Sequence, residues 1–401
     1  MTARLTCLAA VLVCVATSAS AQETPSTDTR TQYPVFMKDS YFSLNIGSIG
    51  YLFSGTQLEP GFEAESIDKA RIAVRADFFG HRFTKWLAAQ VTYMRPGVFV
   101  KYNNVNGTGG AQAVSNAYAG LTFVLTAPLS PKLSLYGEGG YGVTSRSGFV
   151  VNGVVALKPA HYAAGIIGLG FTYQLTPNVD GVLGLTYSPG RRAFTQPSTR
   201  LYSLGFRYNM RALPEAVVIE NRDAGYLFPE NIVRVGLTTN GLGYGVNDVF
   251  SRWIVIFWGG HVETDAGVTI DYARNVFHSK KRFAFDLGAS ASYWRSNETH
   301  QTFRTLSAFP LVRYFFGRLD SADVYFSYSV AGPTLITESI LDGLETGASF
   351  TFQDAMAVGA FLGKSRRLNA EIGIKHFSNG NLATSNAGIK IPLTFTLGVA
   401  F

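Results

Sequence analysis

The chain has few cysteines, few charged residues and few long apolar runs, and each shortage excludes a class of protein. Its two cysteines, Cys7 and Cys14, lie near the N-terminus, in a segment that we expect to be removed. The mature protein then has no thiol for a disulfide, a metal site or redox chemistry. Charged residues make up 15% of the chain, against roughly 25% in typical soluble domains. Beyond the N-terminal segment, no apolar run reaches the roughly 20 residues that a membrane-spanning helix needs.

The start of the chain has the three parts of a secretory signal. Arg4 provides the positive charge, residues 5–16 form the apolar stretch, and Ala19-Ser20-Ala21 is a small-residue cleavage site. We therefore expect residues 1–21 to be removed and the mature chain to begin at Gln22.

What the chain does have is a high content of glycine and aromatic residues, arranged in alternating segments. It contains 42 Gly, and 13% of its residues are aromatic. In residues 283–294, for example, Phe283, Phe285 and Leu287 share one face of a strand while Asp286 lies on the other. The apolar face persists over about 10 residues with aromatics near its ends, which is typical of the lipid-facing band of an outer-membrane barrel. A closed barrel also satisfies its backbone hydrogen bonds in lipid without a spanning helix.

About eight such segments occur in each half of the chain. The predicted strands of the first half cover residues 42–53, 70–79, 86–102, 116–125, 133–145, 161–175, 179–188 and 200–210. Those of the second half cover residues 232–246, 260–277, 282–296, 303–316, 322–335, 347–362, 367–378 and 391–401. Each half closes with an aromatic-rich strand, and residues 211–230 between the halves show no clear alternation.

This pattern predicts an all-β protein, an antiparallel transmembrane β-barrel, for which two architectures fit. The favoured one is a tandem of two eight-stranded barrels, and the alternative is one barrel of about sixteen strands that would enclose a channel. In the tandem, the parts are a signal peptide (1–21), an N-terminal barrel (22–210), a linker (211–230) and a C-terminal barrel (231–401). Residues with inward parity would form a packed ionic interior or a pore wall: Arg71, Arg75, Asp77 and Glu138 in the first half, and Arg234, Asp265, Asp271 and Asp286 in the second.

Two other patterns carry no function in our interpretation. The stretch from Gly137 to Gly142 matches the G-x-G-x-x-G of dinucleotide sites, but it lies within an alternating strand and opens no helix. The scattered histidines lack ligand spacing: His81, His161, His261, His278 and His300. We therefore predict no cofactor and no metal. The 34 basic and 27 acidic residues include no clustered basic stripe, so no nucleic-acid partner is expected.

The most informative stretch lies shortly before the last predicted strand. His376 and Ser378 are two residues apart at the end of the strand 367–378, so both point the same way, with the parity of Ile372 and Ile374. They should therefore face lipid, where an unpaired polar group is costly. Barrels of this kind start and end in the periplasm, so the end of the penultimate strand is expected at the external rim. A His and a Ser so placed can act as a general base and its nucleophile.

The segment from His376 to Ile389, HFSNGNLATSNAGI, resembles the lipid A 3-O-deacylase family (PagL) of outer-membrane barrels, also called acyloxyacyl hydrolases. The resemblance is confined to the second half of the chain, whose eight-strand layout agrees with the family's whole barrel. It implies an outer-membrane serine esterase that removes the 3-O-linked acyl chain from lipid A of lipopolysaccharide. It further implies that Ser378 is the nucleophile, that His376 is its general base and that Asn379 helps to stabilise the oxyanion.

The sequence departs from this family at the residue that orients the histidine. The family has a Glu two positions after the glycine that aligns with Gly388, and this chain has Lys390 there. Glu371 lies on the interior face of its strand, so its parity argues against it as a substitute. Asp354 and Asn386 are the candidates. If the missing acid limits the rate, Lys390→Glu should raise the activity about 10-fold or more.

Three functions compete on this evidence. The first is an esterase acting on lipid A in the outer membrane of a Gram-negative bacterium. The second is a catalytically inactive barrel that is structural or binds lipid, because its site has lost the acid. The third is a pore, which requires the single large barrel. The sequence leaves open the preferred acyl chain, the role of the first half and the oligomeric state.

Overall fold

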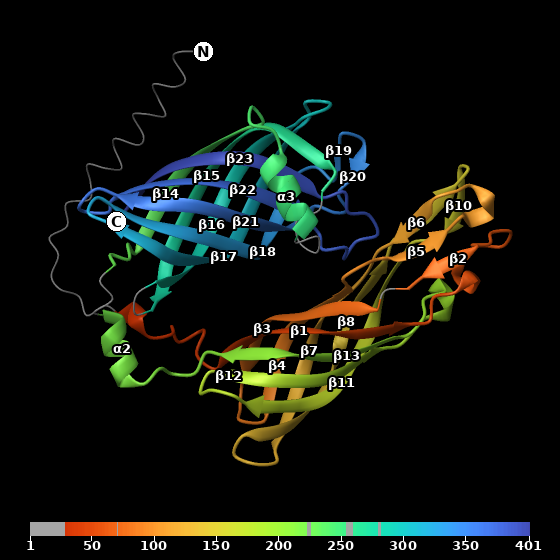
Figure 1. Cartoon of the computed structure of the whole chain (residues 1–401), viewed down its shortest axis with the longest axis horizontal. Coiled ribbons are helices and arrows are strands. Elements are labelled where there is room, and N and C mark those ends of the chain that lie inside the picture. Colours follow the sequence, from red (N-terminus) through yellow and green to blue (C-terminus); the bar gives the residue numbers. More distant parts are fainter. Residues whose placement is uncertain (1–28, 70, 223–225, 254–259, 280–281) are drawn as a thin grey trace.

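The computed structural model describes residues 29–401 except 70, 223–225, 254–259 and 280–281. Sixteen strands close into two separate antiparallel barrels of eight strands each, which lie side by side (Figure 1). The tandem architecture is therefore confirmed, and the single sixteen-stranded barrel, on which the pore depended, is wrong. The predicted signal at 1–21 and the predicted strand start at residue 70 lie outside the described residues.

The first barrel is a meander in which β1 pairs with β13 to close the wall. Its wall consists of β1 (Ser40–Tyr51), β3 (Ile72–Arg82), β4 (Leu87–Pro96), β7 (Asn116–Pro128), β8 (Leu133–Arg146), β11 (Ala160–Gln174), β12 (Val179–Ser188) and β13 (Thr199–Asn209). Its connections contain η2 (Gly55–Gln57), β2 (Ser66–Asp68), β5 (Val100–Asn103), η3 (Val105–Gly107), β6 (Ala111–Val114), β9 (Phe149–Val151), β10 (Val154–Leu157) and η4 (Arg192–Phe194). The segment predicted as one strand over 86–102 is thus divided, because β5 belongs to a separate sheet with β2 and β6.

The second barrel repeats this plan. Its wall consists of β14 (Asn231–Thr239), β15 (Val262–His278), β16 (Phe283–Ser296), β17 (Thr302–Leu319), β18 (Ala322–Ile336), β21 (Phe350–Leu362), β22 (Leu368–Ser378) and β23 (Ile389–Ala400). The other elements are η1 (Thr29–Thr31), α2 (Glu215–Arg222), α3 (Gly245–Trp253), β19 (Ile340–Leu341) and β20 (Leu344–Glu345). The strand predicted over 232–246 is too long, because β14 stops at Thr239 and the chain then forms α3. No helix in the described part of the chain is long and apolar enough to span a membrane.

The connections differ in length between the two ends of the barrels. At one end they are short, at residues 83–86, 129–132, 175–178, 320–321 and 363–367. At the other end all but the connection 297–301 are longer, and they carry β2, β5, β6, β10, β19 and β20, which gather on the right in Figure 1, opposite α2. Outer-membrane barrels have short periplasmic turns and longer extracellular loops. The end of β22, with Ser378, therefore lies at the external rim.

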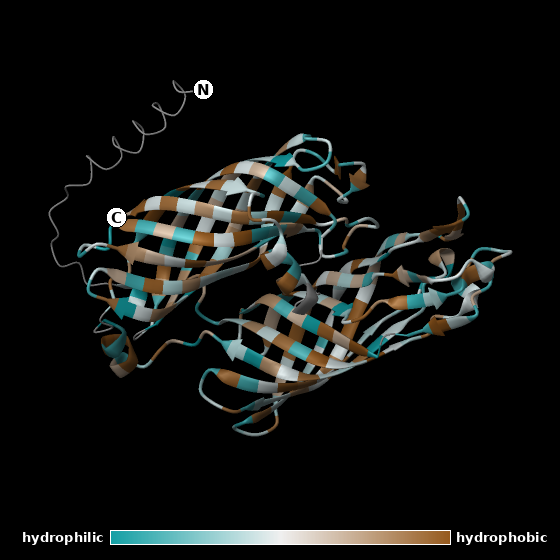
Figure 2. Ribbon diagram, turned by 45° about the horizontal axis from the view of Figure 1, so that its top comes forward, coloured by the Kyte–Doolittle hydropathy of each residue, from teal (hydrophilic) through white to brown (hydrophobic). Residues whose placement is uncertain are grey.

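Hydrophobic and hydrophilic residues alternate along the strands (Figure 2). Many large apolar side chains of the walls are exposed, whereas many polar ones are buried in the interior. In the first barrel Arg75 Nη2 lies 2.6 Å from Glu138 Oε1 and 3.2 Å from Asp77 Oδ1. In the second barrel Arg313 Nη1 lies 2.8 Å from Asp286 Oδ2. All five side chains are buried. Ion pairs thus form part of the side-chain packing inside each barrel, and an eight-stranded barrel is just wide enough to be filled by its own side chains.

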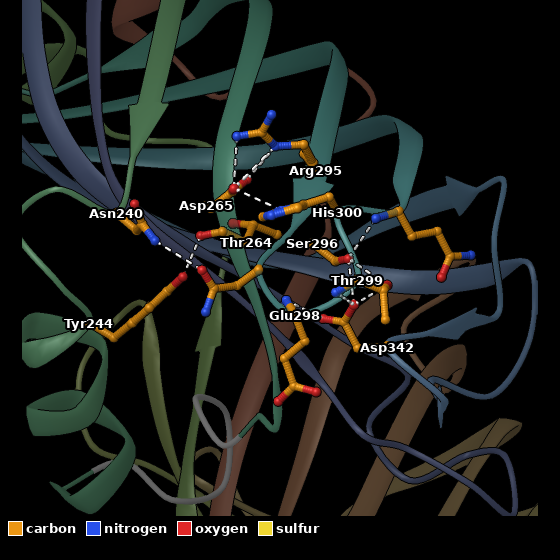
Figure 3. Close-up of polar contacts among 12 residues, drawn as sticks. Asn240, Tyr244, Thr264, Asp265, Arg295, Ser296, Glu298, Thr299, His300 and Asp342 are labelled. Atoms are coloured by element: carbon orange, nitrogen blue, oxygen red, sulfur yellow. Dashed lines mark hydrogen bonds and ion pairs between the residues drawn. The ribbon is translucent and has the colours of Figure 1, made fainter.

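Two residues predicted inside the barrels lie elsewhere. Arg71 is exposed because β3 begins only at Ile72, so this side chain is beyond the end of the wall. Asp265 is itself the extra residue of a bulge between Thr264 and Ala266, which breaks the parity of β15. Its carboxylate pairs instead with the Arg295 guanidinium at the rim, with Nη2 and Oδ2 2.8 Å apart (Figure 3).

Candidate active site

The two residues singled out by the sequence, His376 and Ser378, lie on the outer face of β22. Between them, Phe377 packs inward against Trp294, which fixes the outward direction of its neighbours. The predicted lipid exposure is wrong for the histidine, since His376 is only 1% exposed. Side chains from the neighbouring strands flank it on both sides, and α3 packs over the adjacent part of the same face.

Asp354 brings a carboxylate to the histidine from the neighbouring strand β21. The two residues are register partners, and Asp354 Oδ2 lies 3.8 Å from His376 Nδ1. The other carboxylate oxygen accepts a hydrogen bond of 2.9 Å from the backbone N–H of Ala331. Ala331 has a φ of 52° within a bulge of β18, a conformation that costs a non-glycine residue about 1–3 kcal/mol. The bulge directs this N–H at Asp354 and so holds the acid beside the imidazole.

Asn386 lies beside the serine and not beside the histidine. Its Nδ2 is 3.0 Å and its Oδ1 3.3 Å from Ser378 Oγ. Asn386 Oδ1 also accepts the backbone N–H of Asn379 at 3.1 Å, and the Gly380 N–H donates to Ser378 Oγ at 3.1 Å. Of the two residues considered for the missing acid, Asp354 is the carboxylate within ion-pair distance of the imidazole, whereas Asn386 bonds the serine.

Asn379 anchors the loop that follows β22. Its side chain is 4% exposed, and Nδ2 donates to the carbonyl oxygens of Thr346 at 2.9 Å and Ser385 at 2.8 Å. Both amide protons are therefore donated to backbone oxygens in this conformation. The side chain ties the loop 379–388 to the connection between β20 and β21.

Lys390, at the position of the family acid, flanks His376 from the other side, on β23. Its Nζ lies 2.8 Å from Asp248 Oδ1 and 3.6 Å from Glu263 Oε1. Two carboxylates thus compensate the lysine charge, one from α3 and one from β15. Opposite charges this close attract even where water reaches them.

The helix α3 covers part of the same face because β14 is short. Above the end of β14, β15 and β23 pair directly with each other in parallel, so the chain between β14 and β15 must leave the wall. Asn247 Nδ2 then donates to the Ile391 carbonyl at 3.0 Å, and Phe250 packs against Met356 and Ile374. Sequence reasoning missed this helix. A signal was available in the acidic Asp248 of its first turn.

A polar cluster fixes the loops at the external rim (Figure 3). Asp342 Oδ1 accepts hydrogen bonds from Ser296 Oγ at 2.6 Å and from the Thr299 N–H at 2.9 Å. Burial opposes its ionisation, but these donors outweigh burial, so the pKa of Asp342 lies below its ordinary value. Tyr244 donates to the Thr264 carbonyl at 2.6 Å, and burial raises the pKa of Tyr244 to about 12. The described residues contain no group of three or more His, Cys, Asp or Glu that could hold a metal ion.

Comparison with known proteins assigns the two halves separately. The family model described as lipid A 3-O-deacylase (PagL) matches residues 263–398, and the model described as OmpA-like transmembrane domain matches residues 41–188. A search of curated proteins finds no match.

The search of solved structures finds matches that are distant in sequence, among them three outer-membrane proteins. The outer membrane enzyme PagL is 15% identical, with a TM-score of 0.30, and the match covers 42% of this chain and 99% of that chain. The N-terminal β-barrel domain of OprF from Pseudomonas aeruginosa is 13% identical, with a TM-score of 0.29, over 43% of this chain and 98% of that chain. Neisserial surface protein A is 15% identical, with a TM-score of 0.31, and the match covers 43% of this chain and 97% of that chain.

The family assignment therefore comes from the sequence models, and it agrees with the resemblance inferred from the segment that begins at His376. Residues 263–398 of the C-terminal barrel match the lipid A 3-O-deacylase (PagL) family model, and this barrel follows an OmpA-like one in a single chain of the Gram-negative outer membrane.

Proposed function

We propose that the second barrel is a serine esterase that removes the 3-O-linked acyl chain from lipid A in the outer leaflet. Ser378 is the nucleophile, His376 its general base and Asp354 the acid that orients the base. The observation that carries this proposal is the 3.8 Å separation of His376 Nδ1 and Asp354 Oδ2, on the same outward face as Ser378. An acid, a base and a hydroxyl in this order are the parts of a nucleophilic triad.

The reaction proceeds through an acyl-serine. His376 takes the proton of Ser378 Oγ as this oxygen attacks the ester carbonyl carbon. The resulting tetrahedral oxyanion collapses, the sugar 3-hydroxyl leaves, and it takes the proton from His376. A water molecule then attacks the acyl-serine and gives up one proton to His376, which passes it to Ser378 Oγ as the ester bond breaks, so the fatty acid and the free serine are released. Asp354 stabilises the imidazolium that forms in each step.

The hydrogen-bond donors nearest to the serine are candidates for the oxyanion site. The Gly380 N–H and Asn386 Nδ2 already lie 3.1 and 3.0 Å from Ser378 Oγ. Asn379 would have to release one of its two backbone acceptors before its side chain could serve. Removing one donor that is aimed at the developing charge lowers kcat by about 10²–10³-fold.

The separation of His376 and Asp354 exceeds a direct hydrogen bond, which needs about 3 Å. Catalytic hydrogen bonds in ligand-free enzymes are often long and tighten in the substrate complex. No acid is needed at position 390 in this scheme, because Asp354 supplies a carboxylate from the neighbouring strand on the other side of His376.

The competing proposal is a catalytically inactive barrel that is structural or binds lipid. It rests on the hydrogen bond of the Gly380 N–H to Ser378 Oγ, which is also how a serine stabilises a turn. It also rests on Lys390 at the family's acid position. Mass spectrometry of lipid A separates the two proposals.

Cells that express the wild-type chain should show lipid A lacking one ester-linked acyl chain. Ser378→Ala and His376→Asn should each reduce this loss by about 10³-fold or more, because the nucleophile or its base is gone. Ser385→Ala is the matched control, since this serine of the same loop donates to Glu345 Oε2 and lies outside the triad. Intact lipid A in wild-type cells would refute the enzyme. Full activity of Ser378→Ala would refute this nucleophile.

We also propose the domain division 1–21, 22–210, 211–230 and 231–401, with lipid A or lipopolysaccharide as partner. The division rests on the cleavage pattern before Gln22 and on the two closed sheets. N-terminal sequencing of the protein from outer membranes should begin at Gln22. A sequence that begins before it would contradict the proposed cleavage.

A further inference from the structure

The first barrel presents two polar residues on its outer surface, on strand β4. Gln90 and Thr92 point inward, where they bond Glu138 and Arg75, so Val91, Tyr93 and Arg95 point outward. Val91 is 46% exposed, as expected for a lipid-facing residue. Tyr93 and Arg95 are only 8% and 5% exposed. Something therefore covers this part of the outer surface.

The cover includes the loop that follows Ser378 in the second barrel. Tyr93 Oη donates a hydrogen bond of 2.6 Å to the carbonyl oxygen of Gly380. Gly380 has a φ of 64°, and a β-carbon added there would lie 3.5 Å from Cε2 of the Tyr93 ring. The phenol ring thus packs on the same residue whose N–H is bonded to Ser378 Oγ.

A second contact at the opposite end fixes the barrels relative to each other. Arg30, before the first barrel, donates through Nη1 to the Phe228 carbonyl at 3.0 Å and to Asn275 Oδ1 at 3.2 Å. The rings of Tyr33 and Phe277 are 4.6 Å apart. Two attachments at opposite ends restrain tilting of one barrel against the other more than either attachment alone.

We propose that the N-terminal barrel is a positioning element of the esterase site, and that Tyr93 holds the loop 379–388 in its catalytic conformation. This inference rests on the proposed function of Ser378. Gly380 connects the two: its carbonyl is held by Tyr93, and its N–H is directed at the serine oxygen. The N–H and the carbonyl of Gly380 belong to two planar peptide groups that are joined only by the φ and ψ rotations of this residue. Holding the carbonyl in place therefore also restricts the direction of the N–H.

The test uses the full-length protein and removes one hydroxyl. Tyr93→Phe deletes the bond to Gly380 and keeps the ring. Tyr141→Phe is the matched control, since Tyr141 is an outward tyrosine of the first barrel that is 77% exposed. Heat-modified mobility on gels checks that both variants remain folded barrels.

Hydrogen exchange of the amides in residues 379–388 gives the first measurement. Tyr93→Phe should raise it about fivefold, the factor expected from one net hydrogen bond, and Tyr141→Phe should leave it unchanged. Turnover of purified lipid A gives the second. Tyr93→Phe should lower kcat about fivefold with KM changed less than twofold, because the substrate surface is intact and only the reacting groups lose their alignment.

The possible outcomes separate this inference from the proposed function. Exchange in Tyr93→Phe equal to that in Tyr141→Phe would overturn the docking of the loop. Faster exchange with an unchanged kcat would overturn the positioning role. If the wild-type protein has no deacylase activity while exchange still rises in Tyr93→Phe, the docking stands and the proposed esterase function fails.

Discussion

The two barrels have similar interiors and different outer surfaces. Inside, Arg75 and Glu138 of the first barrel and Arg313 and Asp286 of the second are buried ion pairs. Outside, strands β21, β22 and β23 of the second barrel carry a row of polar residues, while β4 of the first carries Tyr93 and Arg95. Charged interiors fill both barrels and therefore do not distinguish a catalytic barrel from a structural one.

The difference shows where function should be sought in such a protein. A polar residue on the lipid-facing side of a barrel is unfavourable unless another group covers or pairs it. In the second barrel the cover comes from neighbouring strands and α3, and at Gly380 it comes from the first barrel. An outward polar residue that is nevertheless buried, such as His376 or Arg95, therefore indicates either a site or a contact.

The largest effect is expected from the interior of the first barrel. Glu138→Ala removes one of the two carboxylates that pair with the buried Arg75 and leaves Asp77, and removing one partner of a buried pair costs about 3–5 kcal/mol. The free energy of unfolding in urea, measured in lipid vesicles, should fall by about this amount. Glu59→Ala is the control, since its partner Lys158 is largely exposed, and such surface pairs are worth about 0–1 kcal/mol. Equal losses in the two variants would contradict the structural role of the interior pair.

The outer acid should affect the rate and not the fold. Asp354→Asn keeps the size of the side chain but removes the charge beside His376, so kcat should fall about 100-fold or more. Asp265→Asn, which alters a rim acid paired with Arg295, should stay within about twofold of the wild type in the same assay. A wild-type rate in Asp354→Asn would place the orienting acid elsewhere.

Lys390→Glu tests the family position directly. In the structure this change would place a third carboxylate beside Asp248 and Glu263, so repulsion should release α3 and make it more sensitive to protease. The sequence suggests that this variant gains about 10-fold or more in deacylase activity. This gain should not occur if Asp354 already orients His376. Lys390→Gln removes the positive charge without adding a negative one, so it should release α3 less than Lys390→Glu does. A tenfold gain in Lys390→Glu would favour the family position over Asp354.

The smallest effect is expected at the rim, as a function of pH. Because the folded pKa of Asp342 lies below its ordinary value of 3.8, its contribution to stability is complete above that value. The contribution is lost as the pH falls through the lower, folded pKa. Hydrogen exchange in residues 296–301 should therefore rise below about pH 4, and Asp342→Asn should remove this dependence. An unchanged pH profile in Asp342→Asn would show that another group titrates.

Much of the fold could be predicted because alternation is a local property. Each of the sixteen predicted segments overlaps a strand of a barrel wall, and the outward parity of His376 and Ser378 follows from the isoleucines of the same strand. The errors occur where a local feature interrupts the pattern. A bulge turned Asp265 away from the interior, and the early end of β14 released α3 from the wall.

The sequence by itself determined the strands and the faces of their side chains wherever no bulge interrupts the alternation, the family resemblance of the second half, and the histidine and serine of its motif. Only the tertiary structure decided which residues meet across strands. Asp354 lies beside His376 because β21 and β22 pair in one register, and a shift by one residue would move it to the other face. Tyr93 reaches Gly380 across 287 positions of sequence, through the packing of two closed barrels. Alternation within a strand carries no information about either contact.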